Sequence, residues 1–384
     1  MLEKAQEELI QELCGPKYGR GGDTKFRRAG TAKRTLTTRH GTVEFKLVKV
    51  KSLENGSVMR PLLLHMGLEP RRRVVDDLAL ECAEVATYLT YRDSKTVIES
   101  LTKARVSKHR IHSCVQKVGA FIDGERREAA ARRVDLLYAD GTKAHGIDGR
   151  KNEINVIVGK DRKTGEKSLL GLAVNRSWRE TAEQVKGRAE VLISDADRPL
   201  RNALLDKALK YQLCVNHGVR ETSYHLWKAG LPKQERKEIR TRLRAILNTC
   251  RNSAIKRLKD KYVERLRWRI NKTLADLGQL ADELLEDGLT GAAKFIRNSA
   301  NYMVTFARLA MKQVRIPYTN NLMERLMGEI AKRVKNRWMH WSTTGLENLL
   351  NMLLTRYCNR KLYDRLKESY LSHEKRTFIQ VRIA

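Results

Sequence analysis

Polar and apolar residues alternate along residues 26–58, whereas most of the remaining chain repeats its apolar residues at helical spacing. In the segment RTLTTRHGTVEFKLVKVKS, strand-forming residues flank His40-Gly41, and Val43, Phe45 and Leu47 fall on one face. A polar residue followed by glycine is typical of a tight turn between antiparallel strands. The pattern therefore predicts a basic β-hairpin after a short N-terminal helix.

Residues 75–119 carry the helical period, and a break in that period predicts a helix-turn-helix. We expect one helix to begin at Ser94, a turn near Lys103–Val106 and a second helix capped by Ser107. The second helix turns its apolar residues inward and carries Lys108, His109, Arg110 and His112 outward. A capped helix with basic residues in its first turn suits the major groove of DNA, although a packing helical hairpin gives a similar pattern.

From residue 131 the pattern becomes that of an α/β domain. We expect a strand at VDLLYADGT, a hairpin at INVIVGKDRKTGEKSLLGLAV, a helix at TAEQVKGRA, a strand at VLISDAD, a helix at PLRNALLDKAL and a strand at QLCVNH. Residues 220–312 are nearly all helical and highly charged, and YLSHEKRTFIQVRIA closes the chain as a tail.

Two of these strands carry an acid where their apolar face stops. Asp140 follows Leu136 and Tyr138 at alternate positions, and Asp195 follows Val191 and Ile193 in the same way. An acid at the end of a buried strand is costly unless it is paired or binds a cation, although each could also form a turn. If the two strands are neighbours in one sheet, the two acids meet at the same edge.

The segment TNNLMERLMGEIAKRVKNRW, residues 319–338, predicts a helix with an apolar stripe and two glutamates. Glu329 has Arg325 and Arg333 four residues away on either side, which is typical of a solvated salt-bridge ladder. Glu324 has no basic residue at those spacings and lies beside a small flank of Gly328 and Ala331, which could press against another element. It is either a capping-box acid paired with Asn321 or a functional carboxylate.

Three carboxylates with few other ligands select hard ions such as Mg²⁺ or Mn²⁺. Two such ions about 3.5–4 Å apart would activate the attacking oxygen and stabilise the leaving oxygen in phosphodiester chemistry. Asp140, Asp195 and Glu324 are the candidates, with Asp197 a weaker alternative to Asp195 and Asp135 a weak competitor of Asp140. Cys214 and His217 form a C-x-x-H pair, which is either structural or a support to the site.

Composition favours a polyanionic partner. Lys and Arg number 77 against 45 Asp and Glu, and this net charge of +32 is spread along the chain. No run reaches the roughly 18 apolar residues of a spanning helix, so we expect no membrane partner. The six cysteines are scattered without C-x-x-C spacing, which argues against structural zinc or a disulfide scaffold and favours a reducing, intracellular compartment.

Five segments together resemble the DDE transposases of prokaryotic insertion sequences, related to the Mutator-like group: YADGTKAHG, VLISDADRPLRNAL, YQLCVNHGVRE, the helical interruption, and TNNLMERLMGEIAKRVKNRWMHWSTTGLENLLNMLL. The resemblance covers roughly residues 75–360 and implies an RNase H-like core. It implies that Asp140, Asp195 and Glu324 bind Mg²⁺, with Mn²⁺ able to substitute, and that His217 supports the site. It also implies a prokaryotic cytoplasmic protein that joins the nucleoid when bound to DNA.

We therefore expect an α/β protein with five regions: 1–70, the N-terminal helix and basic β-hairpin; 71–128, the helix-turn-helix; 129–219, the first part of the RNase H-like core; 220–312, the helical insertion; and 313–384, the second part of the core and the tail. The residues expected to contact DNA are basic or lie beside basic residues: Ser107, Lys108, His109, Arg110, His112, Lys332, Arg333, Lys335 and Arg337. Trp338 and Trp341 could stack on a base or pack in the core.

The function that we predict is binding of the element's terminal inverted repeats, metal-dependent cleavage and strand transfer into target DNA, by a homo-oligomer assembled on double-stranded DNA. One alternative is an RNase H-like DNA nuclease that cuts without joining. Another is a catalytically inactive DNA-binding protein derived from a transposase.

Overall fold

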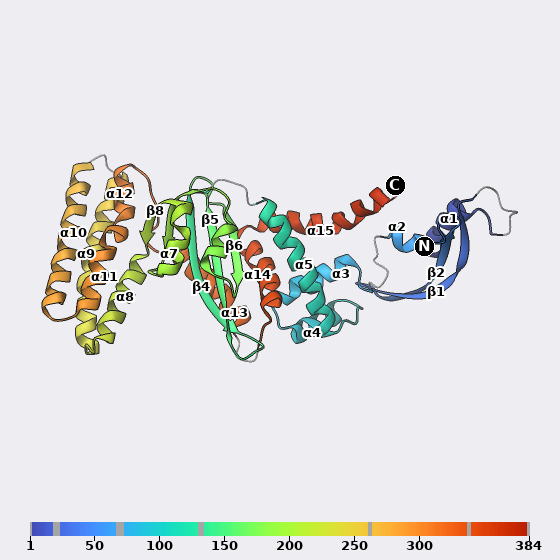
Figure 1. Ribbon diagram of the computed structural model, residues 1–384, viewed down its shortest axis with the longest axis horizontal. Helices are drawn as coiled ribbons and strands as arrows, with labels where there is room; N and C mark the ends of the chain where they lie inside the picture. Colours follow the sequence, from blue (N-terminus) through green and yellow to red (C-terminus); the bar gives the residue numbers. More distant parts are fainter. Residues whose placement is uncertain are drawn as a thin grey trace. The chain divides into compact units, whose positions relative to one another are not determined.

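The computed structural model describes residues 2–17, 24–66, 73–129, 134–259, 263–335 and 339–381, apart from the side chains of residues 2 and 373–381. The chain has a mixed α/β fold with two separate sheets (Figure 1). It divides into two compact units. The first comprises Met1–Arg126, Thr344–Arg356 and Arg360–Ala384, and the second comprises Arg127–Thr343 and Tyr357–Asn359.

The first unit begins with a small antiparallel sheet. Strands β1 (Phe26–Thr38), β2 (Gly41–Ser52) and β3 (Val58–Met59) pair in that order, and helices α1 (Leu2–Cys14) and α2 (Pro61–His65) lie beside them. The turn between β1 and β2 falls on residues 39–40, which confirms the predicted hairpin, and Gly41 adopts a φ of +113° there. The apolar face is buried in a cluster of Leu36, Phe45, Leu47, Leu62 and Leu63.

Helices make up the rest of the first unit: α3 (Asp76–Ala86), α4 (Tyr91–Leu101), α5 (Lys108–Ala129), α14 (Thr343–Cys358) and α15 (Arg360–Val381). Helix α4 begins three residues before the predicted Ser94, because the Thr90 side chain caps it by accepting a hydrogen bond from the Asp93 amide at 3.1 Å. The Ser107 hydroxyl accepts one from the Arg110 amide at 3.2 Å, so the predicted cap of α5 is confirmed. Most of the segment expected to form the C-terminal tail is helical, since α15 continues to Val381.

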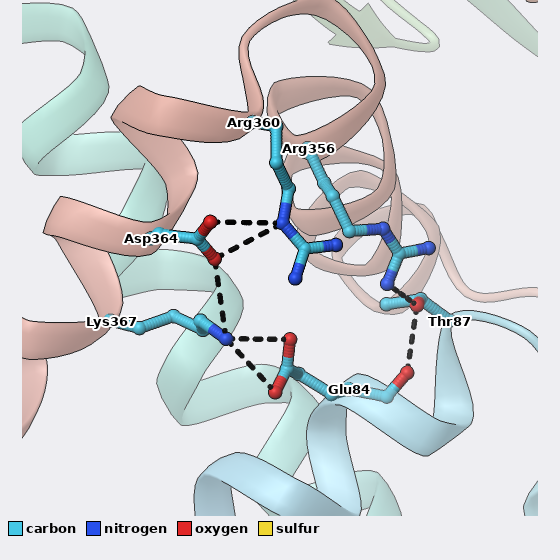
Figure 2. A network of polar contacts seen from close by, with 6 residues as sticks. All are labelled: Glu84, Thr87, Arg356, Arg360, Asp364 and Lys367. Carbon is cyan, nitrogen blue, oxygen red and sulfur yellow. Dashed lines mark hydrogen bonds and ion pairs between the residues drawn. The ribbon is translucent and has the colours of Figure 1, made fainter.

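Polar contacts fasten α3 to the C-terminal helices within this unit (Figure 2). The Lys367 ammonium lies 3.1 and 3.3 Å from the two carboxylate oxygens of Glu84 and 3.4 Å from Asp364. Arg360 donates to the same Asp364 carboxylate at 3.0 and 3.1 Å, and Arg356 donates to the Thr87 hydroxyl at 2.7 Å. Each carboxylate of the network therefore has a cation against it.

The second unit is built on a five-stranded sheet in the order β6-β5-β4-β7-β8. Its strands are β4 (Leu136–His145), β5 (Lys151–Lys160), β6 (Lys167–Val174), β7 (Ala189–Ser194) and β8 (Ala208–Leu213). Strands β4, β5 and β6 pair antiparallel, whereas β7 pairs parallel with both β4 and β8. Their central residues are almost entirely buried, as expected for a sheet covered on both faces.

Short helices connect the strands: α6 (Trp178–Glu183), α7 (Arg198–Leu204) and the 3₁₀ turn η1 (Leu205–Lys207). The helix predicted to run through residues 181–189 ends at Glu183, and Gly187 adopts a φ of +82° that no helix allows. The strand predicted at QLCVNH ends at Leu213, so Cys214 and His217 belong to the start of the next helix.

Helices α8 (Val215–Lys228), α9 (Lys233–Lys259), α10 (Val263–Glu286), α11 (Thr290–Met303) and α12 (Thr305–Met311) form a bundle beside β8 (Figure 1). They occupy almost all of the segment that was predicted to be helical. Helix α13 (Asn321–Val334) then returns the chain to the sheet and packs against β4. In the part of the chain that the structure describes, no helix is both long and apolar enough to cross a lipid bilayer.

Candidate functional site

The parallel pairing of β4 with β7 brings two of the predicted acids together. Leu136, Leu137 and Tyr138 pair with Val191, Leu192 and Ile193, so the same register continued by two residues sets Asp140 opposite Asp195. The two strands are neighbours, as the sequence argument had only supposed. The expectation that both strands end at their acid holds only for β7, because β4 continues to His145 alongside β5.

Asn320 connects helix α13 to both of these strands. Its side chain is fully buried, and its amide nitrogen Nδ2 donates to the backbone carbonyl of Ala139, the residue before Asp140, at 3.2 Å. Its backbone N–H donates to the Sγ atom of Cys214 at 3.2 Å, while the Cys214 N–H donates to the carbonyl of Ser194 at 2.8 Å. The start of α13 is thereby fixed to the ends of β7 and β8 and to β4.

Glu324 lies one turn into α13 and is exposed. The helix is capped by Asn320 without any side-chain hydrogen bond to the first turn, so the capping-box alternative for Glu324 finds no support. Glu329 is a salt-bridge acid as expected, but its partner is Lys332 at 2.6 Å. Gly328 does not press against another element, since a Cβ atom added there would meet nothing within 4 Å.

The acids act on one another electrostatically. Burial, and then the negative charge of Asp195, raises the pKa of Asp140 to about 6, and the charge of Glu324 adds to this effect. Burial also raises the pKa of Asp195, against the opposing hydrogen bond from the Asp197 N–H and the charge of His217. A cluster whose members keep one another from ionising is typical of functional sites, because it destabilises the fold unless a cation is bound.

Helix α8 adds a cation that the sequence analysis missed. The guanidinium of Arg220 donates to Nε2 of His217, and Nδ1 of His217 lies 3.2 Å from Sγ of Cys214. Burial, and next the charge of Arg220, lowers the pKa of His217, while Asp195 and Glu324 act in the opposite direction. The charge of Arg220 also lowers the pKa of both Asp140 and Asp195. Reading Val215 as a helix start would have revealed His217 and Arg220 as an i,i+3 pair.

The competing acids have structural roles. The Asp197 carboxylate caps α7 by accepting a hydrogen bond from the Leu200 N–H at 3.4 Å. Asp135 accepts one from the Arg162 N–H at 2.8 Å in the turn that follows β5. These interactions leave Asp195 and Asp140 as the better candidates at their positions.

The donor set fits a hard divalent cation in its chemistry, because carboxylate oxygens that repel one another are the ligands such an ion prefers. Asp140, Asp195 and Glu324 would hold it. Within the described ranges of the chain, however, no three His, Cys, Asp or Glu side chains converge closely enough to bind one ion. The charges of Asp195 and Glu324 act on Asp140, but the side chains of the three acids are not directed at one point.

The residues expected to contact DNA fall into two groups. On α5, Lys108, His109 and Arg110 are exposed next to the exposed cap Ser107, whereas His112 is half-buried and packs edge-on against the Tyr91 ring at 5.5 Å.

At the end of α13, Lys332 and Lys335 are exposed. Arg333 is instead only 4% exposed and stacks over the Trp341 ring at 4.9 Å, so its predicted place on a DNA-binding surface is wrong. The indole N–H of Trp341 donates to the Val334 carbonyl at 3.3 Å, which confirms a core role for this tryptophan. Arg337 and Trp338 lie outside the described residues.

The chain resembles known proteins over most of its length. Residues 1–360 match the family described as "Transposase, Mutator family". The transposase for insertion sequence element IS256 in transposon Tn4001 from Staphylococcus aureus is 21% identical over 367 residues, covering 89% of each chain. The protein of the same description from Enterococcus faecalis matches to the same extent. The chain belongs to the Mutator family of transposases.

Proposed function

We propose that the chain binds the terminal inverted repeats of its own element, cuts the DNA there with the help of divalent metal ions, and joins the freed 3′-hydroxyl to target DNA. The observation that supports this best is the parallel register of β4 and β7. It sets Asp140 opposite Asp195, with Glu324 near enough for its charge to raise the pKa of Asp140. The relatives are named as insertion-sequence transposases, which agrees with this chemistry.

We interpret the sheet of the second unit as an RNase H-like core. The supporting features are an antiparallel run of three strands, β4 to β6, followed by two parallel strands on the other side of β4. Helices α8–α12 then interrupt this core between β8 and the helix that carries Glu324. This is the order that the resemblance to DDE transposases implies.

We assign Asp140, Asp195 and Glu324 as the metal ligands, with Mg²⁺ as the natural ion and Mn²⁺ as a substitute. When bound, the ions would activate the attacking water or 3′-hydroxyl and offset the charge on the leaving oxygen. Asn320 holds the start of the Glu324 helix against β4 and Cys214, which keeps Glu324 close enough for its charge to act on Asp140.

We assign His217 and Arg220 to the phosphate that is cut. Because Arg220 donates to Nε2 of His217, the ring carries its proton on Nδ1, directed at Cys214. Burial and the charge of Arg220 lower the pKa of His217, which favours the neutral ring, and Arg220 supplies the positive charge that a phosphodiester requires. The positive charge of Arg220 would also offset the repulsion between the acids and the DNA before metal ions bind.

We interpret α4 and α5 as a DNA-binding helix-turn-helix, with Lys108, His109 and Arg110 at the N-terminal end of the recognition helix. Lys332 and Lys335 would bind phosphates near the cut. Two element ends must be brought together for transposition, so we expect a homo-oligomer on double-stranded DNA.

A labelled-oligonucleotide assay with Mg²⁺ or Mn²⁺ tests the proposal, using the DNA that flanks this gene. Wild type should cut and join, whereas Asp140→Ala and Glu324→Gln should bind the same DNA without cutting it. Glu329→Gln is the matched control, because it removes a carboxylate of the same helix that only pairs with Lys332. Cutting by Glu324→Gln at the rate of Glu329→Gln would contradict the triad.

The same assay separates the alternatives. Metal-dependent cutting without any joined product would indicate a nuclease of the RNase H-like class. Binding without cutting by wild type under all metal conditions would indicate a DNA-binding protein with an inactive site.

A further inference from the structure

A cavity of about 610 Å³ lies in the second unit between the sheet edge and the helical bundle. One wall is the edge strand β8, and the others come from α10, α11 and α12. Figure 1 shows the bundle that contains these helices next to β8. The volume lies in the range of cavities that bind small ligands, which is about 300–1,000 Å³. None of the residues assigned above to metal, phosphate or DNA lines it.

The lining is strongly basic. It contains five cations and, among the residues described, no acid; the cations are Arg188, Lys210, Arg267, Arg308 and Lys312. They come from the loop before β7, from β8, from α10 and from α12, so five separate points of the chain direct positive charge at one space. Arg267 also pairs with Glu264 at 2.8 Å, outside the lining, while the lining itself supplies no carboxylate to the cations, which favours an anionic ligand.

The cavity also has an apolar and aromatic wall. Leu209 on β8 is 63% exposed and Tyr302 on α11 is 37% exposed, and both line the cavity. The Tyr302 ring is held in place by an edge-on contact with Tyr211 at 5.2 Å and by the Arg201 guanidinium at 5.6 Å. A fixed aromatic ring beside exposed leucine offers a surface on which a nucleobase can stack.

A simpler explanation exists for part of this pattern. A lysine on an edge strand discourages pairing with another sheet, and Lys210 on β8 fits that role. It does not explain why four further cations face the same space or why two large apolar side chains stay exposed there. Cations around a stacking surface are the combination that binds a nucleotide.

We propose that this cavity binds an unpaired nucleotide of a DNA strand, with its phosphates against the five cations and its base against Tyr302 and Leu209. An unpaired nucleotide fits the cavity, whereas a duplex is too wide to enter a space of this volume. The proposal rests on the proposed function, since cutting an element end is the step that frees a strand next to this protein.

The cavity is connected to the acid cluster through Tyr211. This residue lines the cavity, and its hydroxyl donates to the backbone carbonyl of Asp195 at 2.6 Å. Thr305 of α12, another lining residue, donates to the Tyr211 carbonyl at 2.8 Å. Tyr211 therefore connects the lining of the cavity to the backbone of Asp195.

Binding of fluorescein-labelled dT10 to the full chain, measured by anisotropy without metal, tests the proposal. The variant Lys210→Glu/Lys312→Glu reverses two exposed cations of the cavity. We expect its affinity to fall at least tenfold below that of the control, and its salt slope to shrink by about 1.4, at about 0.7 per lost phosphate contact. The matched control, Lys237→Glu/Lys256→Glu, makes the same change of charge on exposed lysines of α9 outside the lining.

Equal loss of affinity in the two double variants would overturn the proposal, because net charge alone would then explain binding. A second measurement does not depend on charge reversal. On irradiation, dT10 containing 5-iodouracil should cross-link to the peptide that carries Tyr302, and Tyr302→Leu should abolish this cross-link while Tyr302→Phe keeps it. A cross-link mapped only to other peptides would also overturn it.

Competition by thymidine monophosphate identifies the source of the ligand. We expect thymidine monophosphate to displace dT10 only at concentrations far above that of dT10, because a strand engages several cations at once. Displacement at equal nucleotide concentration would contradict binding of a DNA strand and indicate a site for free nucleotides.

The two proposals can fail separately. If wild type does not cut DNA but the cavity variants still lose dT10 binding selectively, the proposed function fails and this inference stands. If wild type cuts DNA but the cavity variants bind dT10 as wild type does, this inference fails and the proposed function stands.

Discussion

In the network of Figure 2, every carboxylate lies against a cation, whereas the acids beside β4 and β7 have other acids nearby. Burial acts to raise the pKa of Asp364, but hydrogen bonds and charge from Arg360 and Lys367 hold it below its ordinary value. The pKa of Asp140 is instead raised to about 6 by burial and by Asp195. The charged residues of the network in Figure 2 join helices to one another. The acids beside β4 and β7 repel one another, and a bound cation would offset this repulsion.

The contrast separates structural charges from functional ones within one chain. A paired acid contributes to stability and has no remaining need for a ligand. An acid whose neighbours are other acids destabilises the fold, and it is kept where chemistry requires it. Neutralising an acid should therefore have opposite effects on stability in the two regions.

The largest expected effect is that of Asp140→Asn. Cutting should fall on the order of a thousandfold or more, because several kcal/mol of metal-dependent transition-state stabilisation is lost. The same variant should be more stable than wild type at pH 8 by at most about 3 kcal/mol, since the pKa of Asp140 rises from an ordinary 3.8 to about 6 on folding.

The pH dependence follows from the direction of this shift. The contribution of Asp140 to stability should fall as the pH rises from about 4 through 6, because the folded state holds the Asp140 proton more tightly than the unfolded chain does. Urea unfolding at pH 4, 6 and 8 without metal measures it. An Asp140→Asn variant whose advantage is the same at all three pH values would remove the electrostatic explanation.

Asn320→Ala should reduce cutting by about a hundredfold, roughly 2.7 kcal/mol, because Glu324 is no longer fixed against the aspartates. Unlike a merely structural defect, this change should also raise the Mg²⁺ concentration needed for half-maximal activity. Asn321→Ala, at the exposed neighbouring position, is the control. An unchanged metal requirement in Asn320→Ala would show that Asn320 does not position the site.

Glu84→Gln should destabilise the protein by about 1–2 kcal/mol, since it leaves the half-buried Lys367 ammonium with a weaker partner. Glu99→Gln, which removes only the surface pair with Lys95, should have a much smaller effect. Thermal unfolding of the two variants measures the difference. If Glu84→Gln instead stabilised the protein, the paired Glu84 would not contribute to stability, and the contrast between the two acid clusters would not hold.

The smallest effect is expected for Lys332→Gln. Binding to duplex DNA should weaken about threefold and the salt slope should fall by about 0.9, the value of one phosphate contact. Stability should not change measurably, because the pair with Glu329 is exposed. Salt-dependent anisotropy with labelled duplex DNA measures it, and a slope equal to that of wild type would exclude Lys332 from the DNA-binding surface.

Local pattern alone predicted much of the site. The alternation that ends at Asp140 and Asp195 and the stripe of the Glu324 helix are encoded within single elements, since side-chain direction follows the strand and helix periods. The polar residue and glycine at 40–41 and the cap at Ser107 likewise act over a few residues. These features needed no knowledge of the rest of the chain.

Tertiary structure decided what local pattern could not. Whether β4 and β7 are neighbours depends on pairing between strands about 50 residues apart, and the sequence supplied this only as a supposition. Asn320 reads as a helix cap, but its amide bonds the Ala139 carbonyl because folding buries it beside β4. Arg333 reads as a surface cation, but Trp341 covers it, and the cavity of five cations exists only where distant segments meet. Periodicity specifies the face of an element, whereas its partners are set by long-range packing.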